Sequence, residues 1–238
     1  MAGFSGGPVV AAAAPPSAAA GQPQAVVALP PVPELMQALA HGRSARARWS
    51  AAESLRQHGT AAACAAPALI ACLSDEDVDV RVSVVRALGY IGEAALPAIP
   101  ALQGLLSDSD GGVRWAAADA LGNFGHPAAP AVPKLVQALD DEEEDVRGSA
   151  ASALGKFGQL GLDVAAAIPR MSLLVGVREE KEWHVRRAAA EALGRCGVAA
   201  AGAVPQLQGA LLDEHPRVRA AVQAALEKIS GSAEPACQ

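Results

Sequence analysis

The chain has few aromatic side chains: three tryptophans, three phenylalanines and one tyrosine make up 3% of its 238 residues. Its apolar residues nevertheless reach 51%, and most of them are Ala, Leu and Val. Such small and aliphatic side chains suit closely packed helices, whereas β-sheet cores favour aromatic residues. The composition therefore predicts an all-α protein.

The sequence also lacks a run of about 18 consecutive strongly apolar residues, which a membrane-spanning helix needs. We therefore expect no transmembrane segment. Basic residues are not in excess, since the net charge is −6. This charge argues against broad nucleic-acid binding, which needs a basic surface, but it leaves room for a local basic patch.

Cysteine is scarce, and the four present are Cys64, Cys72, Cys196 and Cys237. They form no Cys-x-x-Cys pair and none lies near a His at zinc-finger spacing, so a structural zinc site is not expected. We expect free thiols in a reducing, cytoplasmic compartment, with Cys72 and Cys196 facing the core.

Residues 1–32 contain no charged side chain and are rich in Ala, Pro and Gly. Several prolines interrupt any helical period, so we expect a disordered or loosely ordered leader. The basic region of a secretory signal is missing, and the first basic residue is Arg43. An organelle is the alternative location if the leader is a targeting segment. Residues 231–238 are expected to form a short tail.

The dominant feature of the chain is a repeat of 33 residues. The phrase Val-Arg-x-x-x-x-x-Ala-Leu-Gly-x-x-Gly begins at Val80, Val113, Val146 and Val185, with degraded copies at Ala47 and Val218. Its arginines are spaced by 33, 33, 33, 39 and 33 residues: Arg48, Arg81, Arg114, Arg147, Arg186 and Arg219. A fixed period of this length indicates stacked structural repeats. We predict an α-solenoid of six helix–turn–helix units over residues 33–230.

Each unit carries the signals of two short helices. In the third unit, Pro100 fits the first position of an apolar helix, and a second helix starts near Val113. Gly125 fits a left-handed C-terminal cap, and the prolines after it should keep the chain from continuing as helix. A Gly in the last turn of helix two costs about 1 kcal/mol against Ala, so its recurrence predicts a close approach of a neighbouring helix. The four copies are Gly89, Gly122, Gly155 and Gly194.

The stretches Asp75–Gly89 and Asp108–Gly122 follow the pattern Asp-x-x-x-x-Val-Arg-x-x-Ala-Ala-x-Ala-Leu-Gly, with two substitutions in the first. This pattern resembles HEAT-like repeats of the short type found in bacterial lyases, and the resemblance covers roughly residues 33–230. It implies a solenoid whose second helices line the concave face. Such repeats serve scaffolds, adaptors and a few enzymes, so the resemblance says more about fold than about function.

Acidic residues cluster just before five of the six predicted second helices: Asp75-Glu76-Asp77, Asp108 and Asp110, Asp140–Asp145, Glu179-Glu180 and Asp213-Glu214. Carboxylates there cap free N–H groups and suit the positive end of the helix. Because the repeated Arg follows at once, we expect an Asp–Arg ladder between adjacent units. A metal site is the alternative, but the longest acidic run lacks the Gly and the distal Glu of a calcium loop. We expect no metal.

The positions one, five and nine residues after each repeated Arg share one helix face. They vary from unit to unit, while their flanks stay Ala and Leu. The types Trp, Tyr and Arg, which are enriched at interface hot spots, recur there. We predict that this stripe binds a protein partner, alone or in a large assembly, through Trp49, Glu53, Arg86, Tyr90, Trp115, Asp119, Asn123, Arg187, Glu191 and Arg195. The alternative is that its aromatic side chains fill gaps between helices or shield the N-terminal unit.

The 39-residue spacing reflects two insertions of three residues, in Gln159–Ala166 and Val175–Trp183. Insertions in solenoids map to loops, often at a binding face. We therefore add Trp183 to the partner-binding residues as a loop contact. The alternative is that its ring packs back over the stack.

Catalytic motifs are not found in the sequence. The resembling deoxyhypusine hydroxylases bind two irons through repeated His-Glu pairs, but no His precedes a Glu here. The matching slots read Ser50-Ala51, Ser83-Val84, Ala116-Ala117 and Ala188-Ala189. We predict no catalytic or cofactor-binding residues, and a scaffold or adaptor that holds a protein in a concave groove. The alternative is a phycobilin-lyase-like enzyme or chaperone acting on a pigment or protein.

Overall fold

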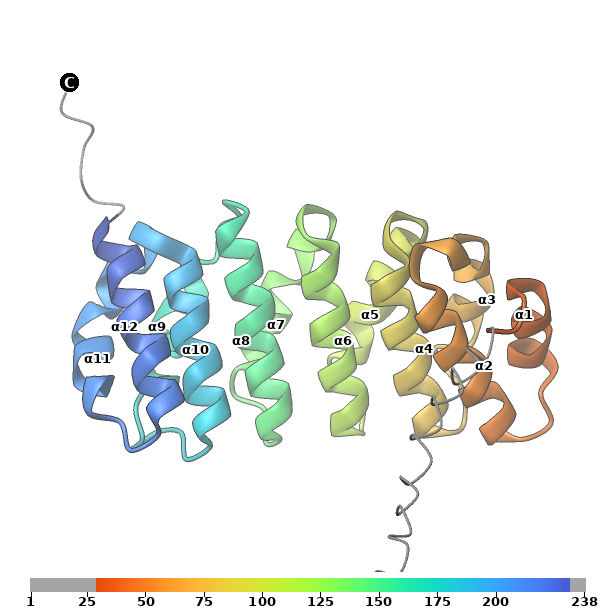
Figure 1. Ribbon diagram of the computed structural model, residues 1–238, viewed down its shortest axis with the longest axis horizontal. Helices are drawn as coiled ribbons and strands as arrows, with labels where there is room; N and C mark the ends of the chain where they lie inside the picture. The colour runs from red at the N-terminus through yellow and green to blue at the C-terminus, as the bar shows by residue number, and fades with distance from the viewer. Residues whose placement is uncertain (1–28, 232–238) are drawn as a thin grey trace, which may run out of the picture.

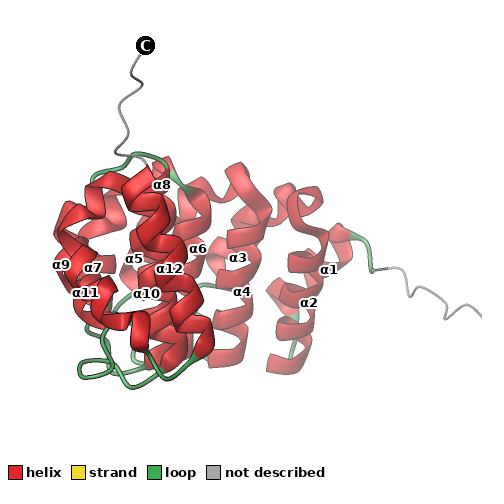
Figure 2. Cartoon of the chain, turned by 60° about the vertical axis from the view of Figure 1, so that its left-hand side comes forward, coloured by secondary structure: helices red, strands yellow, loops and turns green. Residues whose placement is uncertain are grey.

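The computed structural model describes residues 29–231, which form six helix pairs and no strand. Figures 1 and 2 show the pairs stacked side by side in chain order. The first helices are α1 (Val32–His41), α3 (Ala66–Ala71), α5 (Ile99–Leu105), α7 (Val132–Ala138), α9 (Ile168–Leu174) and α11 (Val204–Gly209). The second helices are α2 (Ala45–His58), α4 (Val78–Ile91), α6 (Gly111–Phe124), α8 (Glu144–Gln159), α10 (Trp183–Cys196) and α12 (Pro216–Gly231).

This architecture confirms the predicted all-α solenoid of six units. Helix α1 begins at Val32 and helix α12 ends at Gly231, one residue outside each predicted boundary of the solenoid. The predicted leader over 1–32 and tail over 231–238 fall almost wholly outside the described residues, so both stay predictions.

In the third unit, the two helix starts differ from the predictions by one or two residues. Pro100 stands at the second position of α5 rather than the first, where a missing N–H is equally harmless because that group has no helical partner. Helix α6 begins at Gly111 instead of near Val113. The Asp110 side chain causes the earlier start, since it caps the helix by accepting the Val113 N–H at 3.2 Å.

Short 3₁₀ helices join each second helix to the next pair or extend a first helix, where the sequence had predicted a break. They are η1 (Gly59–Ala65), η2 (Gly92–Ala98), η3 (His126–Ala131), η4 (Ala165–Ala167), η5 (Gly197–Ala203) and η6 (Ala210–Leu212). Pro127 and Pro130 lie inside η3. Proline ends the α-helical hydrogen-bond ladder, but its fixed φ also suits a 3₁₀ turn.

The glycine that ends most second helices has an unusual backbone conformation. Gly125 has φ 63° and ψ −133°. The predicted positive φ is confirmed, but this ψ lies outside the left-handed helical region, so the predicted cap geometry is wrong. The same conformation recurs at Gly59, Gly92 and Gly197. Glycine adopts it freely because it has no Cβ, and the sharp turn leads directly into the 3₁₀ segment.

Neighbouring second helices approach so closely that a glycine of one meets the backbone of the next. A Cβ added to Gly89 would lie 3.1 Å from the Cα of Ala120, and one added to Gly155 would lie 2.6 Å from the Cα of Ala192. The same crowding, at 2.9 Å, occurs at Gly122 and Gly194. The predicted close approach is confirmed.

The two rows of helices are packed unequally. Neighbouring second helices make the most extensive contacts in the described chain, whereas neighbouring first helices touch little. Since a more closely spaced row spans the shorter side of a curved stack, we place the second helices on the inner side. The core between the rows is built from the recurrent Leu, fully buried as Leu88, Leu121, Leu154 and Leu193.

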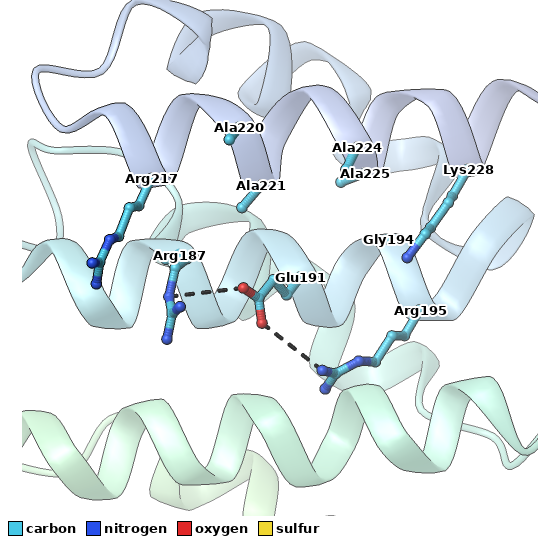
Figure 3. A pocket seen from close by; sticks show the side chains of 10 residues that line it. All are labelled: Arg187, Glu191, Gly194, Arg195, Arg217, Ala220, Ala221, Ala224, Ala225 and Lys228. Atoms are coloured by element: carbon cyan, nitrogen blue, oxygen red, sulfur yellow. Dashed lines mark ion pairs between the residues drawn. The ribbon is translucent and has the colours of Figure 1, made fainter.

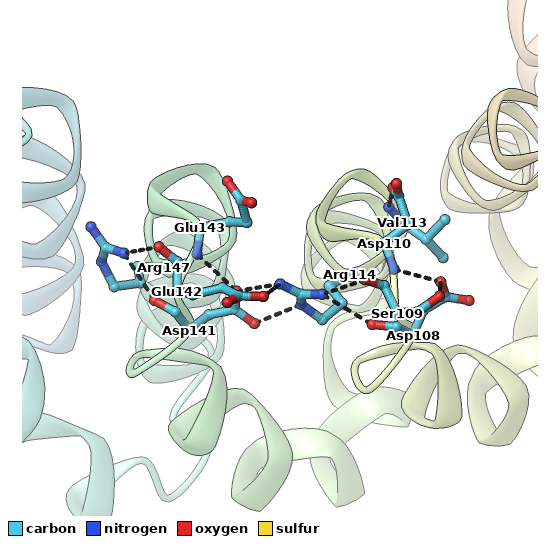
Figure 4. A network of polar contacts seen from close by, with 9 residues as sticks. All are labelled: Asp108, Ser109, Asp110, Val113, Arg114, Asp141, Glu142, Glu143 and Arg147. Atoms are coloured by element: carbon cyan, nitrogen blue, oxygen red, sulfur yellow. Dashed lines mark hydrogen bonds and ion pairs between the residues drawn. The ribbon is translucent and has the colours of Figure 1, made fainter.

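An arginine–carboxylate ladder connects the loops along one edge of the stack. Arg114 donates from Nε and Nη2 to the two carboxylate oxygens of Asp141 at 2.7 and 2.8 Å, and from Nη1 to the Asp108 carbonyl at 3.0 Å (Figure 4). Equivalent two-point contacts join Arg48 to Asp75, Arg147 to Glu180, and Arg186 to Asp213. The remaining rung, Arg81 to Asp108, is a single contact of 3.4 Å. The predicted ladder is confirmed, with Glu in place of Asp in one rung.

The carboxylates of the ladder are held in their charged form. Asp213 is buried, and its Oδ1 also accepts the His215 backbone N–H at 2.8 Å. Burial raises the pKa of Asp213, but the hydrogen bonds from Arg186 and the backbone outweigh this effect, so the pKa lies below its ordinary value. The same balance lowers the pKa of Asp141 and Glu180. These groups therefore stabilise the stack rather than titrate near neutrality.

One stretch of 28 residues, Val78–Leu105, is long and apolar enough to cross a membrane by length and composition, and its most apolar 18-residue window has a mean hydropathy of 1.3. It runs through α4, η2 and α5 without interruption. Half of its most apolar window is buried in the stack. Core helices of soluble proteins pass the same test, and the contacts of α4 with α2 and α6 account for the apolar residues of this one.

Candidate partner-binding site

The variable stripe runs along the accessible side of the second helices. Trp49 is 41% exposed and Tyr90 is 50% exposed, and the other predicted members are exposed or half-buried. The alanines and leucines beside them are buried. The structure therefore brings the ten predicted residues into one surface row over α2, α4, α6 and α10, and α8 contributes Gly148, Ser152 and Lys156 between them.

At the N-terminal end, Trp49 borders an open hollow of about 330 Å³ that also includes Arg46 and Asp79. On the same helix, the Glu53 carboxylate accepts from Arg56 Nε at 2.9 Å. This hydrogen bond is the largest cause that lowers the pKa of Glu53, against the opposing effect of burial. Glu53 is thus occupied by a neighbour on its own helix.

Two arginines lie over aromatic rings of the next unit. The Arg56 guanidinium carbon is 5.3 Å from the centre of the Tyr90 ring, and that of Arg86 is 5.8 Å from the centre of the Trp115 ring. Cation–π contacts of this kind hold both partners in place. Arg86, Tyr90 and Trp115 therefore form a fixed surface, in which Trp115 is half-buried.

The middle of the stripe is polar. Lys156 of α8 donates from Nζ to the Asn123 side-chain oxygen at 2.8 Å and lies 3.5 Å from the Asp119 carboxylate. Asp119 and Asn123 thus bind a lysine that was not among the predicted partner-binding residues.

At the C-terminal end, a groove of about 440 Å³ lies between α10 and α12 (Figure 3). Glu191 stands between the two arginines of its own helix, 3.7 Å from Arg187 Nε and 3.8 Å from Arg195 Nη2. The floor and walls are mostly small residues: Gly194, Ala220, Ala221, Ala224 and Ala225. Two further cations line the groove, Arg217 and Lys228.

Those two cations were missed by the prediction. Lys228 belongs to the stripe pattern, nine residues after Arg219. It was left out of the predicted site because the other two stripe positions of its unit are alanines. Arg217 precedes the positions counted from the repeated Arg. It lies three residues before Ala220, so a search for i, i+3 neighbours on that face would have found it.

Trp183 is not in a loop, so that part of the prediction is wrong. It is the first residue of α10, because the insertion ends before it. Its half-buried ring stacks on the His215 ring, with 4.0 Å between centres and 7° between planes. The guanidinium carbons of Arg187 and Arg217 lie 5.8 and 5.6 Å from the ring centre. Its role in partner binding stays a prediction.

A second hollow, of about 660 Å³, lies on the opposite row between α9 and α11, beside the inserted residues. It exposes apolar side chains, with Leu173 at 45%, Val177 at 53% and Leu212 at 91%. No residue of this hollow was predicted as a site, because the stripe search covered only the second helices.

The chemistry available to the described residues is limited. Within residues 29–231, no three His, Cys, Asp or Glu side chains are grouped so that they could hold a metal ion. Cys196 is buried, as predicted, and burial raises its pKa to about 11. Cys72 is half-buried and packs against the core, whereas Cys64 is exposed. A thiol with a raised pKa is a poor nucleophile.

Several solved structures share this fold. An engineered protein from a structural genomics consortium is 25% identical, with a TM-score of 0.65 over 84% of this chain and 96% of its own. A designed armadillo repeat protein in complex with the peptide (KR)4 is 21% identical, with a TM-score of 0.67 over 83% and 99%. The complex of CpcE and CpcF of phycocyanin lyase from Nostoc sp. PCC7120 is 23% identical, with a TM-score of 0.52 over 68% and 96%.

No curated protein matches the chain. A family model described as HEAT repeats matches residues 32–112, 66–155, 99–172 and 171–238. These overlapping matches extend from the first residue of α1 past the end of α12, in step with the period of the sequence. The chain therefore belongs to the HEAT-repeat family.

Proposed function

We propose that this protein is a non-catalytic scaffold or adaptor that binds a peptide segment of a protein partner along the stripe. The stripe is the observation that carries the proposal. It presents accessible aromatic and arginine side chains at its two ends and polar side chains between them, and the residues beside the row are small and aliphatic. Aromatic and arginine residues are the usual hot spots of protein interfaces.

Rigidity supports the proposal as well. The stripe side chains stand on helices that are locked together by Gly–Ala contacts and by the ladder. Arg86 is already held over the Trp115 ring before any ligand arrives. A preorganised surface loses less conformational entropy on binding, so more of the contact energy goes into affinity. The designed armadillo repeat protein that holds the peptide (KR)4 has the same fold, which supports an extended peptide as the form of the ligand.

A lyase-like role is the second candidate, and it rests on the fold shared with the CpcE–CpcF complex. An enzyme is expected to have a deep polar pocket with a perturbed ionisable group. In the described chain, the perturbed carboxylates lie mainly in the ladder, and the hollows are open to solvent. Visible absorption after mixing the protein with a linear tetrapyrrole tests this candidate, since a bound pigment changes the spectrum.

The main test is affinity purification from the native cells with three versions of the full chain. They are the wild type, Trp49→Ala/Trp115→Ala on the stripe, and Val177→Ala/Leu212→Ala on the opposite row. Circular dichroism and thermal melting confirm that each variant is folded. We expect a partner that is retained by the wild type and by the second variant but is lost by the stripe variant.

The opposite pattern would contradict the proposal. A partner lost only by Val177→Ala/Leu212→Ala places the interface at the hollow between α9 and α11. A partner retained by all three versions also removes the stripe from the interface.

A further inference from the structure

The groove between α10 and α12 differs in charge from the rest of this acidic protein. Four cationic side chains line it, Arg187, Arg195, Arg217 and Lys228, against one carboxylate, Glu191 (Figure 3). We propose that this groove binds an acidic peptide segment of the partner, in which Asp or Glu side chains recur. The inference rests on the proposed function and adds the charge, the length and the position of the ligand.

The groove is open because α12 presents small side chains to it between Arg217 and Lys228. Ala220 and Ala224 occupy the stripe positions that carry Trp115 and Asp119 in α6. Gly194 lies at the closest approach of the two helices, 2.9 Å from Ala225 when a Cβ is added. A peptide backbone can therefore come close to the helices without displacing a large side chain.

The cations stand at both ends of the groove. Figure 3 shows Arg187 and Arg217 together near one end, and Arg195 and Lys228 near the other. Arg217 and Lys228 are eleven residues apart on α12, which corresponds to about 16 Å along the helix axis. An extended peptide covers this distance with about five residues. Acidic side chains four or five positions apart would thus reach both pairs of cations.

The arginines are positioned before binding but keep donors available. Arg187 and Arg217 both lie against the Trp183 ring, which in turn stacks on His215. The Arg187 Nε atom is buried and has no hydrogen-bond partner, since its contact with Glu191 is 3.7 Å long. A guanidinium group has five N–H donors in a fork that matches a carboxylate. The Arg187 side chain is 41% exposed, so a carboxylate ligand in the groove would accept from the exposed part of this fork.

The observations favour a peptide over a nucleic acid. The basic groove is short, and the stripe beyond it carries Asp119 and Glu53. A longer polyanion that follows the stripe would meet these carboxylates and be repelled by them. A short acidic segment stays within the groove, where four cationic side chains outnumber the single carboxylate of Glu191.

The test is fluorescence anisotropy of labelled hexaglutamate with the full-length chain at low and high salt. We expect binding that weakens with salt, and an affinity at least about tenfold lower for Arg195→Glu/Arg217→Glu, because two attractive charges become repulsive. The matched control, Arg43→Glu/Arg178→Glu, makes the same change in net charge at exposed arginines outside the groove. It should bind within about twofold of the wild type, because screened surface charges contribute little.

Three results would overturn the inference. They are no binding by the wild type, an equal loss in the control variant, and equally tight binding of an oligothymidylate of the same length. The proposed function is judged separately. If Trp49→Ala/Trp115→Ala loses the native partner while hexaglutamate does not bind, the stripe remains an interface and only the acidic ligand is wrong. If hexaglutamate binds as expected and Trp49→Ala/Trp115→Ala still retains the native partner, the groove is confirmed and the role of the N-terminal stripe is wrong.

Discussion

Replacing Gly155 with Ala should change the stability of the protein in two opposite ways, through helix propensity and through packing. Gly155 lies inside α8, where Ala is favoured over Gly by about 1 kcal/mol. However, the new Cβ would stand 2.6 Å from the Cα and 2.8 Å from the Cβ of Ala192 in α10. Ordinary contacts of a Cβ begin near 3.4 Å, so the helices would have to separate by about 0.8 Å at this point.

The cost of that separation should exceed the gain in propensity. The obstacle is backbone, which cannot rotate away as a long side chain could. Overpacking of a well-filled interface costs about 1–3 kcal/mol, and the α8–α10 contact is the most extensive between any two helices described. We therefore expect Gly155→Ala to lower the free energy of unfolding by up to about 2 kcal/mol after the gain in propensity is included.

Urea unfolding followed by circular dichroism measures this difference, and Gly104→Ala is the matched control. Gly104 lies inside α5, and an added Cβ there has nothing within 4 Å. This variant should gain up to about 1 kcal/mol from propensity alone. If Gly155→Ala is as stable as the wild type or more stable, the recurrent glycines are not required by helix contact and the reasoning fails.

Four further predictions concern stability and reactivity. Leu121→Ala should cost about 2–5 kcal/mol in a urea melt, because Leu121 is fully buried; a loss well under about 1 kcal/mol would show that the core assignment is wrong. The pKa of Asp213 lies below its ordinary value, about 3.9, so its contribution to stability is present above that pH and is lost as the pH falls through the lower folded value. The stability difference between the wild type and Asp213→Asn should therefore be constant above about pH 5 and shrink below about pH 4, and a difference that persists in stronger acid would contradict this. Ser109→Glu should stabilise the chain by less than about 1 kcal/mol at low salt and should have no effect at high salt. In three other units a glutamate at this position lies 3.3 to 3.5 Å from the arginine of the preceding unit. Equal gains at both salt concentrations would argue against an ion pair. Exposed Cys64 should react with iodoacetamide at about pH 8, whereas Cys196 should stay unmodified, because it is buried and its pKa is raised to about 11. Mass spectrometry of the folded protein measures the labelling of each cysteine. Early labelling of Cys196 would mean that this part of the stack opens.

Two features that depend on the period of the sequence were predicted correctly. The ladder is one example, because Asp108 and Arg114 recur at fixed offsets and each arginine must face the loop of the next unit. The close contact at Gly122 is another, since a costly Gly that recurs inside a helix needs a packing reason. Both follow from geometry that is the same in every unit.

Features that depend on the exceptions to the period were missed. The ring of Trp183 stacks on His215, 32 residues further along the chain, because the insertion ends just before α10 and leaves the ring at a helix start. Sequence spacing contains no information about that contact. The ψ of Gly125 was missed for a different reason. It recurs with the period, but a Gly after a helix is compatible with more than one positive-φ conformation.

The sequence alone predicted the number of units, the class of the fold and the face of each second helix that varies. It could do so because a solenoid repeats one local structure, and each unit contacts only its neighbours. The charge of the groove depended on packing instead. Arg187 and Arg217 come from different units, and they share the Trp183 ring because Gly194 and Ala225 allow α10 and α12 to lie close together. The sequence alone therefore could not show that these two arginines lie against the same ring.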